Sequence, residues 1–443
     1  MQGSANRAFE ASALPSATDP CLIGVIDVGS NSVRIVVYDG RARTPTYYFD
    51  EKVQCGLGKN LAETGTLHPD GAVRARRALR RFVALGREMR LSRLVGVATA
   101  AVREAADGPA FCADVLAETG LALRRISGAE EAALAAEGVR LGDPSARGLV
   151  CDLGGASMEL AALTSAGIRA CGTAPIGPLR MGTLQTEGAV LDAIDAGLDA
   201  LTRAVPPGAE TLILVGGSWR GIAKLDMRRR NHPLRLVHGY AAPAAELAET
   251  CAWIAVQNSI DLSAQTDTSP ARLELLPLAA RVLPRLLDRY APRRIEMSAY
   301  GLREGVLVRE MPPALVARDP LLEAARGMER AGGRNPGYGD AVFAWLLPLI
   351  GACEARRRRL IHAACLLHDI GWRSPPDARA ELCYDLILKA NLTALDHRER
   401  VFLAVTAVHR HKASALARLP SEVLALLCEA DLAQAAWLGR ALR

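Results

Sequence analysis

The sequence predicts an α/β protein with two tandem domains, followed by an all-helical region. Three observations support this prediction. A unit of strand, acid, glycine turn and strand occurs twice, within residues 21–40 and 149–163. Apolar strand-like runs alternate with helical stretches from residue 21 to about residue 306, which is typical of an α/β sheet in each half. From about residue 320 onward, the pattern indicates one helix after another, rich in Ala, Leu and Arg.

The first of the two units is "CLIGVIDVGSNSVRIVVYDG". An apolar run that predicts a buried strand ends on Asp27, and four turn-forming residues follow it, Gly29, Ser30, Asn31 and Ser32. Such a turn closes many β-hairpins. It also suits a phosphate, because glycine lets backbone N–H groups approach an oxyanion while a nearby acid holds a metal ion or a water. This stretch by itself leaves both interpretations open.

The second unit, "LVCDLGGASMELAAL", favours the phosphate interpretation. When Asp152 is aligned with Asp27, the apolar runs of the two units coincide. The other aligned residues of the second unit are Gly154, Gly155, Ser157 and Glu159, which fall on Gly29, Ser30, Ser32 and Arg34. The offset of 152 − 27 = 125 residues is about one domain length. The repeat therefore predicts a duplicated domain that presents two phosphate loops to one cleft.

The remaining elements follow in order. The stretch "GAVRARRALRRFVALGREM" predicts a long helix, and "LVGVAT" predicts a strand that leads into "AAVREA". In the second half, "GLVCDLG", "TLILVGGS" and "RIEMSAYG" predict strands, and "EMPPALVARDPLLEAARG" marks the connection to the helical region. We expect a disordered lead at residues 1–20, α/β domains at 21–131 and 132–310, and a helical domain at 318–443.

The composition indicates a soluble globular protein of a reducing cytoplasm. Half of the residues are hydrophobic, no stretch is long enough to span a membrane, and residues 1–20 lack the apolar core of a signal peptide. The 10 cysteines are scattered, without a C-x-x-C pair. The net charge of +6 comes mainly from arginine, which fits an anionic partner or an arginine-rich genome equally well. Aromatic residues, at 4%, are too sparse for nucleic-acid recognition by base stacking.

Five segments in order resemble the exopolyphosphatase and guanosine-pentaphosphate phosphohydrolase (Ppx/GppA) family of the actin-like ATPase superfamily. They are "IDVGSNSVRIVVYD", "ATAAVREA", "ISGAEEAALAAEGV", "CDLGGASMEL" and "SAYGLREGVL", and they cover residues 21 to about 310. The resemblance implies two tandem ribonuclease-H-like domains with a cleft between them. It further implies that water removes a terminal phosphate there in the presence of Mg²⁺.

The resemblance also implies roles for individual residues. Asp27, Asp152 and Glu159 would hold Mg²⁺ or its waters. Glu131 would orient or deprotonate the attacking water, and Arg103 would meet the charge of the transferred phosphoryl group. The residues expected to bind phosphates are Gly29, Ser30, Asn31 and Ser32 in the first loop, Gly154, Gly155 and Ser157 in the second, and Gly216, Gly217 and Ser218 in a third.

Each of these roles has a simpler structural alternative. Glu131 and Arg103 could be solvated helix residues, and Ser157 could only cap a turn. Glu159 alternates with apolar neighbours, so it could lie on the outer face of a strand. Ala156 replaces a usual third glycine and narrows the approach to a phosphate, which is tolerable outside positive φ.

The third loop, "LVGGSWRGIAKL", also departs from the family pattern. It resembles the nucleotide-binding loop of the heat-shock ATPases, which keeps a purine-bearing substrate open. The bulky Trp219 beside Arg220 would then lie near the ligand. Packing of Trp219 in the core is the alternative.

The helical region resembles the HD-type metal phosphohydrolases at "LLHDIG", which contains His368 and Asp369. Asp431 and His409 or His411 are candidate further ligands, but the upstream helix contains no histidine. An incomplete ligand set binds metal poorly, so we expect a degenerate HD-like domain used for packing, dimerisation or polymer binding. The run Arg356–Arg359 could be a solvated face or a rail for a polyanion.

These inferences lead to an expected function. The first hypothesis is a cytoplasmic, homodimeric, Mg²⁺-dependent exopolyphosphatase that acts on inorganic polyphosphate, without membrane or specific nucleic-acid partners. The second is a guanosine-pentaphosphate phosphohydrolase of the stringent response, or one enzyme with both activities. More distant alternatives are an ATP-driven kinase or chaperone-like module, and a non-catalytic sensor of polyphosphate or alarmone.

Overall fold

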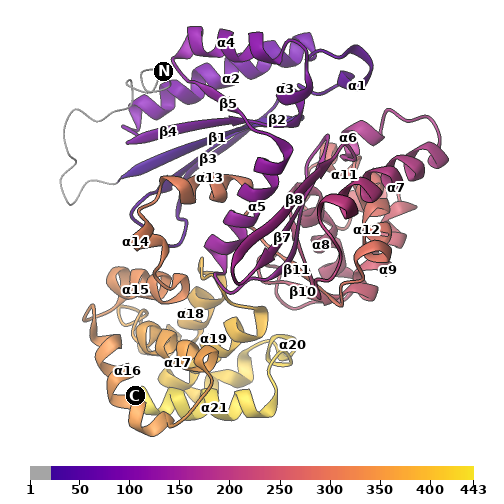
Figure 1. Cartoon of the computed structure of the whole chain (residues 1–443). Helices are drawn as coiled ribbons and strands as arrows, with labels where there is room; N and C mark the ends of the chain where they lie inside the picture. The colour runs from indigo at the N-terminus through magenta and orange to yellow at the C-terminus, as the bar shows by residue number, and fades with distance from the viewer. Residues whose placement is uncertain (1–20) are drawn as a thin grey trace.

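The computed structural model describes residues 21–443, so the predicted lead at residues 1–20 lies outside the described residues. Two α/β parts lie side by side, and a helical part lies below them (Figure 1). This arrangement confirms the predicted fold class. Among the described residues, no helix has the length and apolar character needed to cross a membrane.

The first sheet has the strand order β3-β2-β1-β4-β5. Its strands are β1 (Leu22–Val28), β2 (Ser32–Asp39), β3 (Tyr47–Gln54), β4 (Arg93–Ala98) and β5 (Leu123–Arg125). The first three strands are antiparallel neighbours, whereas β4 pairs parallel to β1. The helices that follow these strands are α1 (Leu61–Thr64), α2 (Pro69–Glu88), α3 (Ala100–Glu104) and α4 (Gly108–Thr119). The apolar face of α2, with Leu79 and Phe82, packs on this sheet and forms the first core.

The second sheet has the order β10-β11-β9-β6-β7-β8. Its strands are β6 (Gly148–Leu153), β7 (Met158–Thr164), β8 (Gly167–Ala174), β9 (Thr211–Val215), β10 (Ala241–Pro243) and β11 (Arg294–Met297). Its helices are α6 (Pro178–Met181), α7 (Glu187–Ala204), α8 (Gly217–Arg229), α9 (Ala244–Ala255), α10 (Ser259–Ser263), α11 (Pro270–Leu273) and α12 (Leu276–Tyr290). Without the edge strand β10, and read from its other end, this order is β8-β7-β6-β9-β11. It then matches the order β3-β2-β1-β4-β5 of the first sheet, with β6 in the place of β1 and β7 in the place of β2. The duplication seen in the two sequence units therefore extends to whole sheets.

Two helices join the α/β parts. Helix α5 (Gly128–Gly142) and helix α13 (Leu302–Glu310) cross closely. A side chain at Gly305 would place its Cβ only 1.8 Å from the Leu134 carbonyl oxygen, so the crossing requires glycine there. The apolar residues of α13 pack with β1 and β2 of the first sheet, although the sequence predicts residues 302–310 to belong to the second domain. The predicted division at residues 131 and 132 runs through α5, which contacts both parts, and these domain boundaries stay a prediction.

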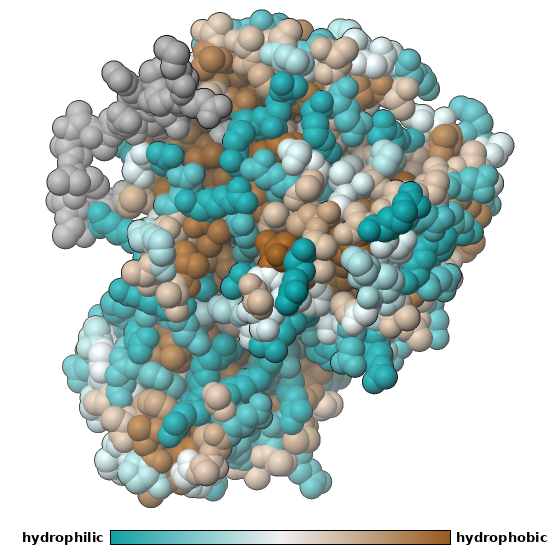
Figure 2. Space-filling model, viewed as in Figure 1, coloured by the Kyte–Doolittle hydropathy of each residue, from teal (hydrophilic) through white to brown (hydrophobic). Residues whose placement is uncertain are grey.

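The rest of the chain is helical, as predicted. It comprises α14 (Pro313–Val316), α15 (Pro320–Gly332), α16 (Tyr338–Ile350), α17 (Ala355–Leu367), α18 (Pro376–Lys389), α19 (His397–His411), the 3₁₀ helix Ala413–Arg418, α20 (Ser421–Leu424) and α21 (Glu429–Ala441). Helices α17 and α19 each contribute more residues to the core of this region than any other helix. Hydrophilic side chains predominate on the face of the helical region shown in Figure 2, with small apolar patches between them.

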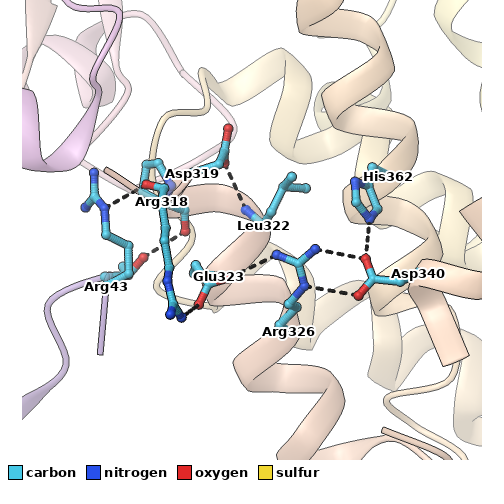
Figure 3. A network of polar contacts seen from close by, with 10 residues as sticks. Arg43, Arg318, Asp319, Leu322, Glu323, Arg326, Asp340 and His362 are labelled. Atoms are coloured by element: carbon cyan, nitrogen blue, oxygen red, sulfur yellow. Dashed lines mark hydrogen bonds and ion pairs between the residues drawn. The ribbon is translucent and has the colours of Figure 1, made fainter. Parts of the chain in front are cut away.

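A chain of polar contacts attaches the helical region to the loop after β2 (Figure 3). Arg43 Nε donates to the Arg318 carbonyl oxygen at 2.9 Å, and Thr44 Oγ1 donates to the Pro320 carbonyl oxygen at 2.8 Å. Within the helical region the chain of contacts continues through Arg326 and Asp340 to His362. These contacts therefore fix the position of the helical region on the loop after β2.

Candidate active site

A cavity of about 200 Å³ lies between the two α/β parts, at the carboxyl ends of β1, β6 and β9. All three predicted glycine loops reach it. The predicted site residues that line it are Asp27, Gly29, Ser30, Asn31, Ser32, Glu131, Asp152, Gly154, Gly155, Ser157, Gly216, Gly217 and Ser218. Two predicted residues, Arg103 and Glu159, lie behind this lining.

The first two loops have the same local geometry. Gly29 N donates to Ser32 O at 3.0 Å, and Gly154 N donates to Ser157 O at 3.0 Å. Between these bonds, the backbone N–H groups of the loop tips donate no hydrogen bond to any described residue. The tips are Ser30 and Asn31 in one loop and Gly155 and Ala156 in the other. Free N–H groups on two opposed turns form an anion cradle, and Ala156 is not at positive φ, so its methyl group is tolerated.

The third loop opens helix α8. Gly216 has φ of 107°, and a Cβ there would lie 2.6 Å from Asp152 Oδ1. Only glycine therefore allows the loop to pass this carboxylate. Gly217 and Ser218 form the first turn of α8, where unpaired N–H groups favour an anion.

Asp27 and Asp152 are the carboxylates best placed for a cation. Burial raises the pKa of Asp152 to about 6, and it also raises the pKa of Asp27 against the opposing effect of Arg303. Asp27 Oδ2 accepts from Arg303 Nη1 at 3.4 Å, whereas the Asp152 carboxylate has no hydrogen-bond partner among residues 21–443. Mg²⁺ in proteins commonly takes one or two carboxylates together with substrate phosphates and water. The residues present fit such an ion.

Glu159 occupies a different environment from these two aspartates. It pairs with Asp152 across β6 and β7, is 1% exposed, and does not line the cavity. Its Oε1 accepts from Thr173 Oγ1 at 2.9 Å, and its buried Oε2 has no hydrogen-bond partner among the described residues. Burial raises its pKa well above the usual range, which favours the protonated form. The role of Glu159 as a metal ligand stays a prediction, and the geometry favours the two aspartates.

Glu131 lies in the first turn of α5 and faces the cavity. Arg103 Nη1 donates to Glu131 Oε2 at 2.8 Å and to the Ile126 carbonyl oxygen at 3.3 Å, which leaves Oε1 without a hydrogen-bond partner in the described chain. Burial raises the pKa of Glu131 to about 7, although Arg103 lowers it. The adjacent Glu130 points away, toward Arg124 and Arg309. Arg103 thus holds Glu131 in place, and its predicted contact with a phosphoryl group stays a prediction.

Five basic side chains around the cavity were not among the predicted site residues, although the sequence placed one of them, Arg220, in the third loop. They are Arg34, Lys52, Arg220, Arg272 and Arg303, and they also line an outer hollow that continues from the cavity. The charged groups of Lys52, Arg220 and Arg272 have no hydrogen-bond or ion-pair partner among the described residues. Burial and the neighbouring arginines lower the pKa of Lys52 to about 8 and that of Arg220 to about 10. Crowded, unpaired cations of this kind are stabilised by a bound polyanion.

Only part of this basic cluster had a signal in the sequence. Arg34 aligns with Glu159 in the repeat, and Arg303 lies in the family-like segment "GLREGVL". Lys52 and Arg272 belong to no motif. Trp219 is fully buried in the hydrophobic core of the second α/β part and does not line the cavity. Its neighbour Arg220 does line the cavity.

The predicted HD-type residues do not converge. His368 Nδ1 contacts the Cys365 carbonyl oxygen at 2.6 Å, and Asp369 forms a two-armed ion pair with Arg334 at 3.2 Å. Asp431 instead binds Arg398 and caps helix α21. Within the described part of the chain, no group of three or more His, Cys, Asp or Glu side chains is placed to hold a metal ion.

The arginine run in α17 is occupied by internal contacts. Arg356 pairs with Glu399, Arg357 pairs with Asp431, and Arg359 pairs with Asp319. These three side chains therefore stabilise the helical region, whereas Arg358 is exposed and forms no ion pair with any described residue. A role of the run as a rail for a polyanion stays a prediction.

The fold and the cavity together define a class of protein: a two-domain, actin-like ATPase fold whose cleft suits phosphate chemistry. The model of the Ppx/GppA phosphatase family matches residues 36–314, and a model described as exopolyphosphatase, C-terminal, matches residues 342–443. The first match covers more than half of the chain, so the protein belongs to the Ppx/GppA phosphatase family. It is accordingly a phosphoanhydride hydrolase.

Individual relatives are distant. Exopolyphosphatase 1 of Mycobacterium bovis is 23% identical over 303 residues, which cover 65% of this chain and 88% of the relative. Retrograde regulation protein 2 of Saccharomyces cerevisiae is 24% identical over 341 residues, or 69% of this chain and 58% of that protein. A crystal structure of an exopolyphosphatase from Cytophaga hutchinsonii has a TM-score of 0.60 at 22% identity, covering 65% of this chain and 97% of that one. The Aquifex aeolicus Ppx/GppA phosphatase has a TM-score of 0.54 at 24% identity, covering 66% and 99%. These structures share the fold of the two α/β parts.

Proposed function

We propose that the protein is an exopolyphosphatase that hydrolyses the terminal phosphate of inorganic polyphosphate with Mg²⁺. The observation that carries this proposal is the row of unpaired cations that continues outward from the catalytic cavity. A chain of phosphates has one negative charge or more at every unit, so it can use each of these cations in turn. The described residues that line the central cavity include no aromatic ring for a base.

The geometry divides the reaction among the residues of the cleft. The free N–H groups of the two opposed loops bind the terminal phosphate and orient it. Glu131 Oε1 faces the cavity and accepts a proton from the water that attacks the terminal phosphorus, as the bond to the remaining chain breaks. Arg103 keeps Glu131 in that orientation. Mg²⁺, held by Asp27 and Asp152, would neutralise charge on the phosphate oxygens.

Guanosine pentaphosphate is the second candidate substrate. Tyr47 lines the outer hollow beside Lys52 and Arg272, and it is 44% exposed. A guanine base could stack on this ring while its phosphates reach the cavity. The fixed hydrogen bond of Tyr47 to Glu304, at 3.3 Å, would hold the ring in place for such a contact.

The deciding experiment measures phosphate release from long polyphosphate, short polyphosphate, guanosine pentaphosphate and ATP side by side, with Mg²⁺ and with EDTA. We expect the highest kcat/KM for polyphosphate and loss of activity in EDTA. A higher kcat/KM for the pentaphosphate would reverse the order of the two candidates. Activity that EDTA leaves unchanged would contradict the metal assignment.

Lys52 is expected to make substrate capture depend on pH. Its pKa near 8 means that its charged form predominates in the free enzyme below that pH and is lost above it. We therefore expect kcat/KM for polyphosphate to fall as the pH rises through about 8.

Lys52→Met should raise KM by about tenfold or more at pH 7 and abolish this fall. Lys52→Arg, which keeps its charge, is the matched control and should shift the fall to higher pH. An unchanged pH profile in Lys52→Met would show that another group causes it.

Removal of the helical region should affect long chains more than the chemistry. All residues that line the cavity and the outer hollow lie between Asp27 and Glu304, and two solved relatives match only about two thirds of this chain while being covered almost completely themselves. A protein ending at residue 312 is expected to cleave short polyphosphate at a rate within a few fold of the full chain, with weaker binding of long chains. Steady-state kinetics with two chain lengths, on protein shown to be folded by circular dichroism, provides the test. Loss of short-chain activity in the folded truncated protein would make the helical region part of the catalytic machinery.

We also propose that the enzyme is a cytoplasmic homodimer. The family resemblance supports the dimer, and the absence of disulfides among the 10 cysteines fits a reducing compartment. Sedimentation over a range of protein concentrations would test the dimer, and cell fractionation would test the location.

A further inference from the structure

We propose that the helical region carries a second binding site, for a nucleotide, at the position of the His368–Asp369 pair. A cavity of about 670 Å³ lies there, formed by the end of α15, one face of α16, the turn after α17 and the end of α19. This volume is within the range of pockets that bind small organic ligands. None of its lining residues belongs to the catalytic cavity, so this site is independent of the proposed function.

One wall of this cavity is cationic. Arg410, in the last turn of α19, lines the cavity, and its buried Nε has no hydrogen-bond partner within residues 21–443. Its guanidinium group also forms no ion pair with any described residue, because the nearby carboxylate of Asp369 is already bound in two places by Arg334. An unpaired, partly buried guanidinium is costly to desolvate unless an anion binds it. Arg410 therefore offers a site for a phosphate group, next to the Arg334–Asp369 ion pair.

The opposite wall is aromatic and apolar. Tyr338, Ala341, Val342 and Trp345 lie on α16 at spacings of three, four and seven residues, so they form one stripe along the helix, and all four line the cavity. Tyr338 is 54% exposed and Trp345 is 64% exposed, which is unusual for such large rings. Either of these accessible rings can stack on a flat heterocycle.

The combination of walls identifies the class of ligand. Inorganic phosphate or a polyphosphate chain would bind Arg410 and make no contact with the aromatic stripe. An apolar molecule would contact the stripe and leave Arg410 unpaired. A nucleotide makes both contacts, because its base stacks on one of the rings while its phosphate pairs with the guanidinium group of Arg410.

Calorimetric titration of the full-length protein with GMP tests this inference, with AMP, ribose 5-phosphate, guanosine and inorganic phosphate as comparison ligands. We expect GMP and AMP to bind one site per chain. Ribose 5-phosphate, guanosine and phosphate should each bind at least about tenfold more weakly, since each lacks one of the two contacts. Equal affinity for ribose 5-phosphate and GMP would overturn the role of the aromatic wall. Equal affinity for guanosine and GMP would overturn the role of Arg410.

Variants then locate the site. Arg410→Met keeps the length of the side chain without its charge, and Trp345→Ala removes an exposed ring that supports no core. Both are expected to weaken GMP binding about tenfold or more while short polyphosphate is hydrolysed as before. Lys52→Met, in the catalytic cleft, is the matched control and should bind GMP normally. If Lys52→Met lost GMP binding while Arg410→Met and Trp345→Ala kept it, the nucleotide would be bound in the cleft and the inference would be wrong.

Discussion

Replacement of Glu131 by glutamine is expected to lower kcat for polyphosphate by about 10²–10⁴. The substitution keeps the size of the side chain and most of its hydrogen bonding, but it removes the carboxylate that accepts the proton of the attacking water. Substrate binding should be kept or slightly tightened, because one negative charge leaves a site for polyanions. Turnover and equilibrium binding of polyphosphate, measured on the same protein, separate these two effects.

Glu130→Gln is the matched control for this prediction. Glu130 is next to Glu131 in the chain, but its carboxylate pairs with Arg124 and Arg309 on the outer side of α5. It should therefore retain nearly full activity. An inactive Glu130→Gln protein with an active Glu131→Gln protein would mean that the neighbouring glutamate is the base. If both proteins stayed active, the base would have to lie elsewhere.

The pH dependence provides a second measurement on Glu131. Its pKa of about 7, raised by burial, means that the carboxylate needed to accept a proton forms only as the pH rises through that value. We expect kcat/KM to rise through about pH 7, below the fall caused by Lys52. Arg103→Met removes the partner that lowers this pKa, so the rising limb should move to higher pH. An unmoved limb would contradict the role of Arg103 in holding and charging Glu131.

Replacement of Asp152 by alanine is expected to abolish turnover and the dependence on Mg²⁺. Its carboxylate lies at the end of β6, faces the cavity and has no hydrogen-bond partner among the described residues, as expected for a group that binds a cation. Loss of a cation at a phosphoryl centre costs several kcal/mol, which corresponds to a loss in kcat of about a hundredfold or more. Retention of more than about a tenth of the activity at saturating Mg²⁺ would contradict this assignment.

Glu159→Gln is the informative companion to Asp152→Ala. The two carboxylates belong to paired residues of neighbouring strands. Glu159, however, is buried behind the residues that line the cavity, and it accepts a hydrogen bond from Thr173. We expect its Mg²⁺ dependence to resemble that of the wild type. An increase in the Mg²⁺ concentration needed for half-maximal activity, similar to that expected from loss of a ligand, would place Glu159 on the metal.

Features that depend on the spacing of neighbouring residues could be predicted before the structure was known. The alternation of apolar runs predicted two α/β sheets and a helical region, and the repeated acid and glycine turns predicted the loops that meet at the cavity. Such loops can be predicted because glycine at a tight turn and an acid at a strand end act within a few residues of each other. The position of Glu130 and Glu131 at a helix start was visible for the same reason, since Ser127 caps that helix.

The side chains that complete the site could be identified only once the packing of the two α/β parts was known. Lys52 lies on an edge strand of the first sheet and Arg272 on a short helix of the second part, so no local pattern relates them. Packing of the two parts across α5 and α13 brings them to one hollow and buries them enough to shift the pKa of Lys52. The same packing pairs Arg103 with Glu131 and buries Glu159 beneath the second loop. Burial and charge pairing depend on contacts between residues far apart in the chain, and these are set by how the sheets and helices assemble.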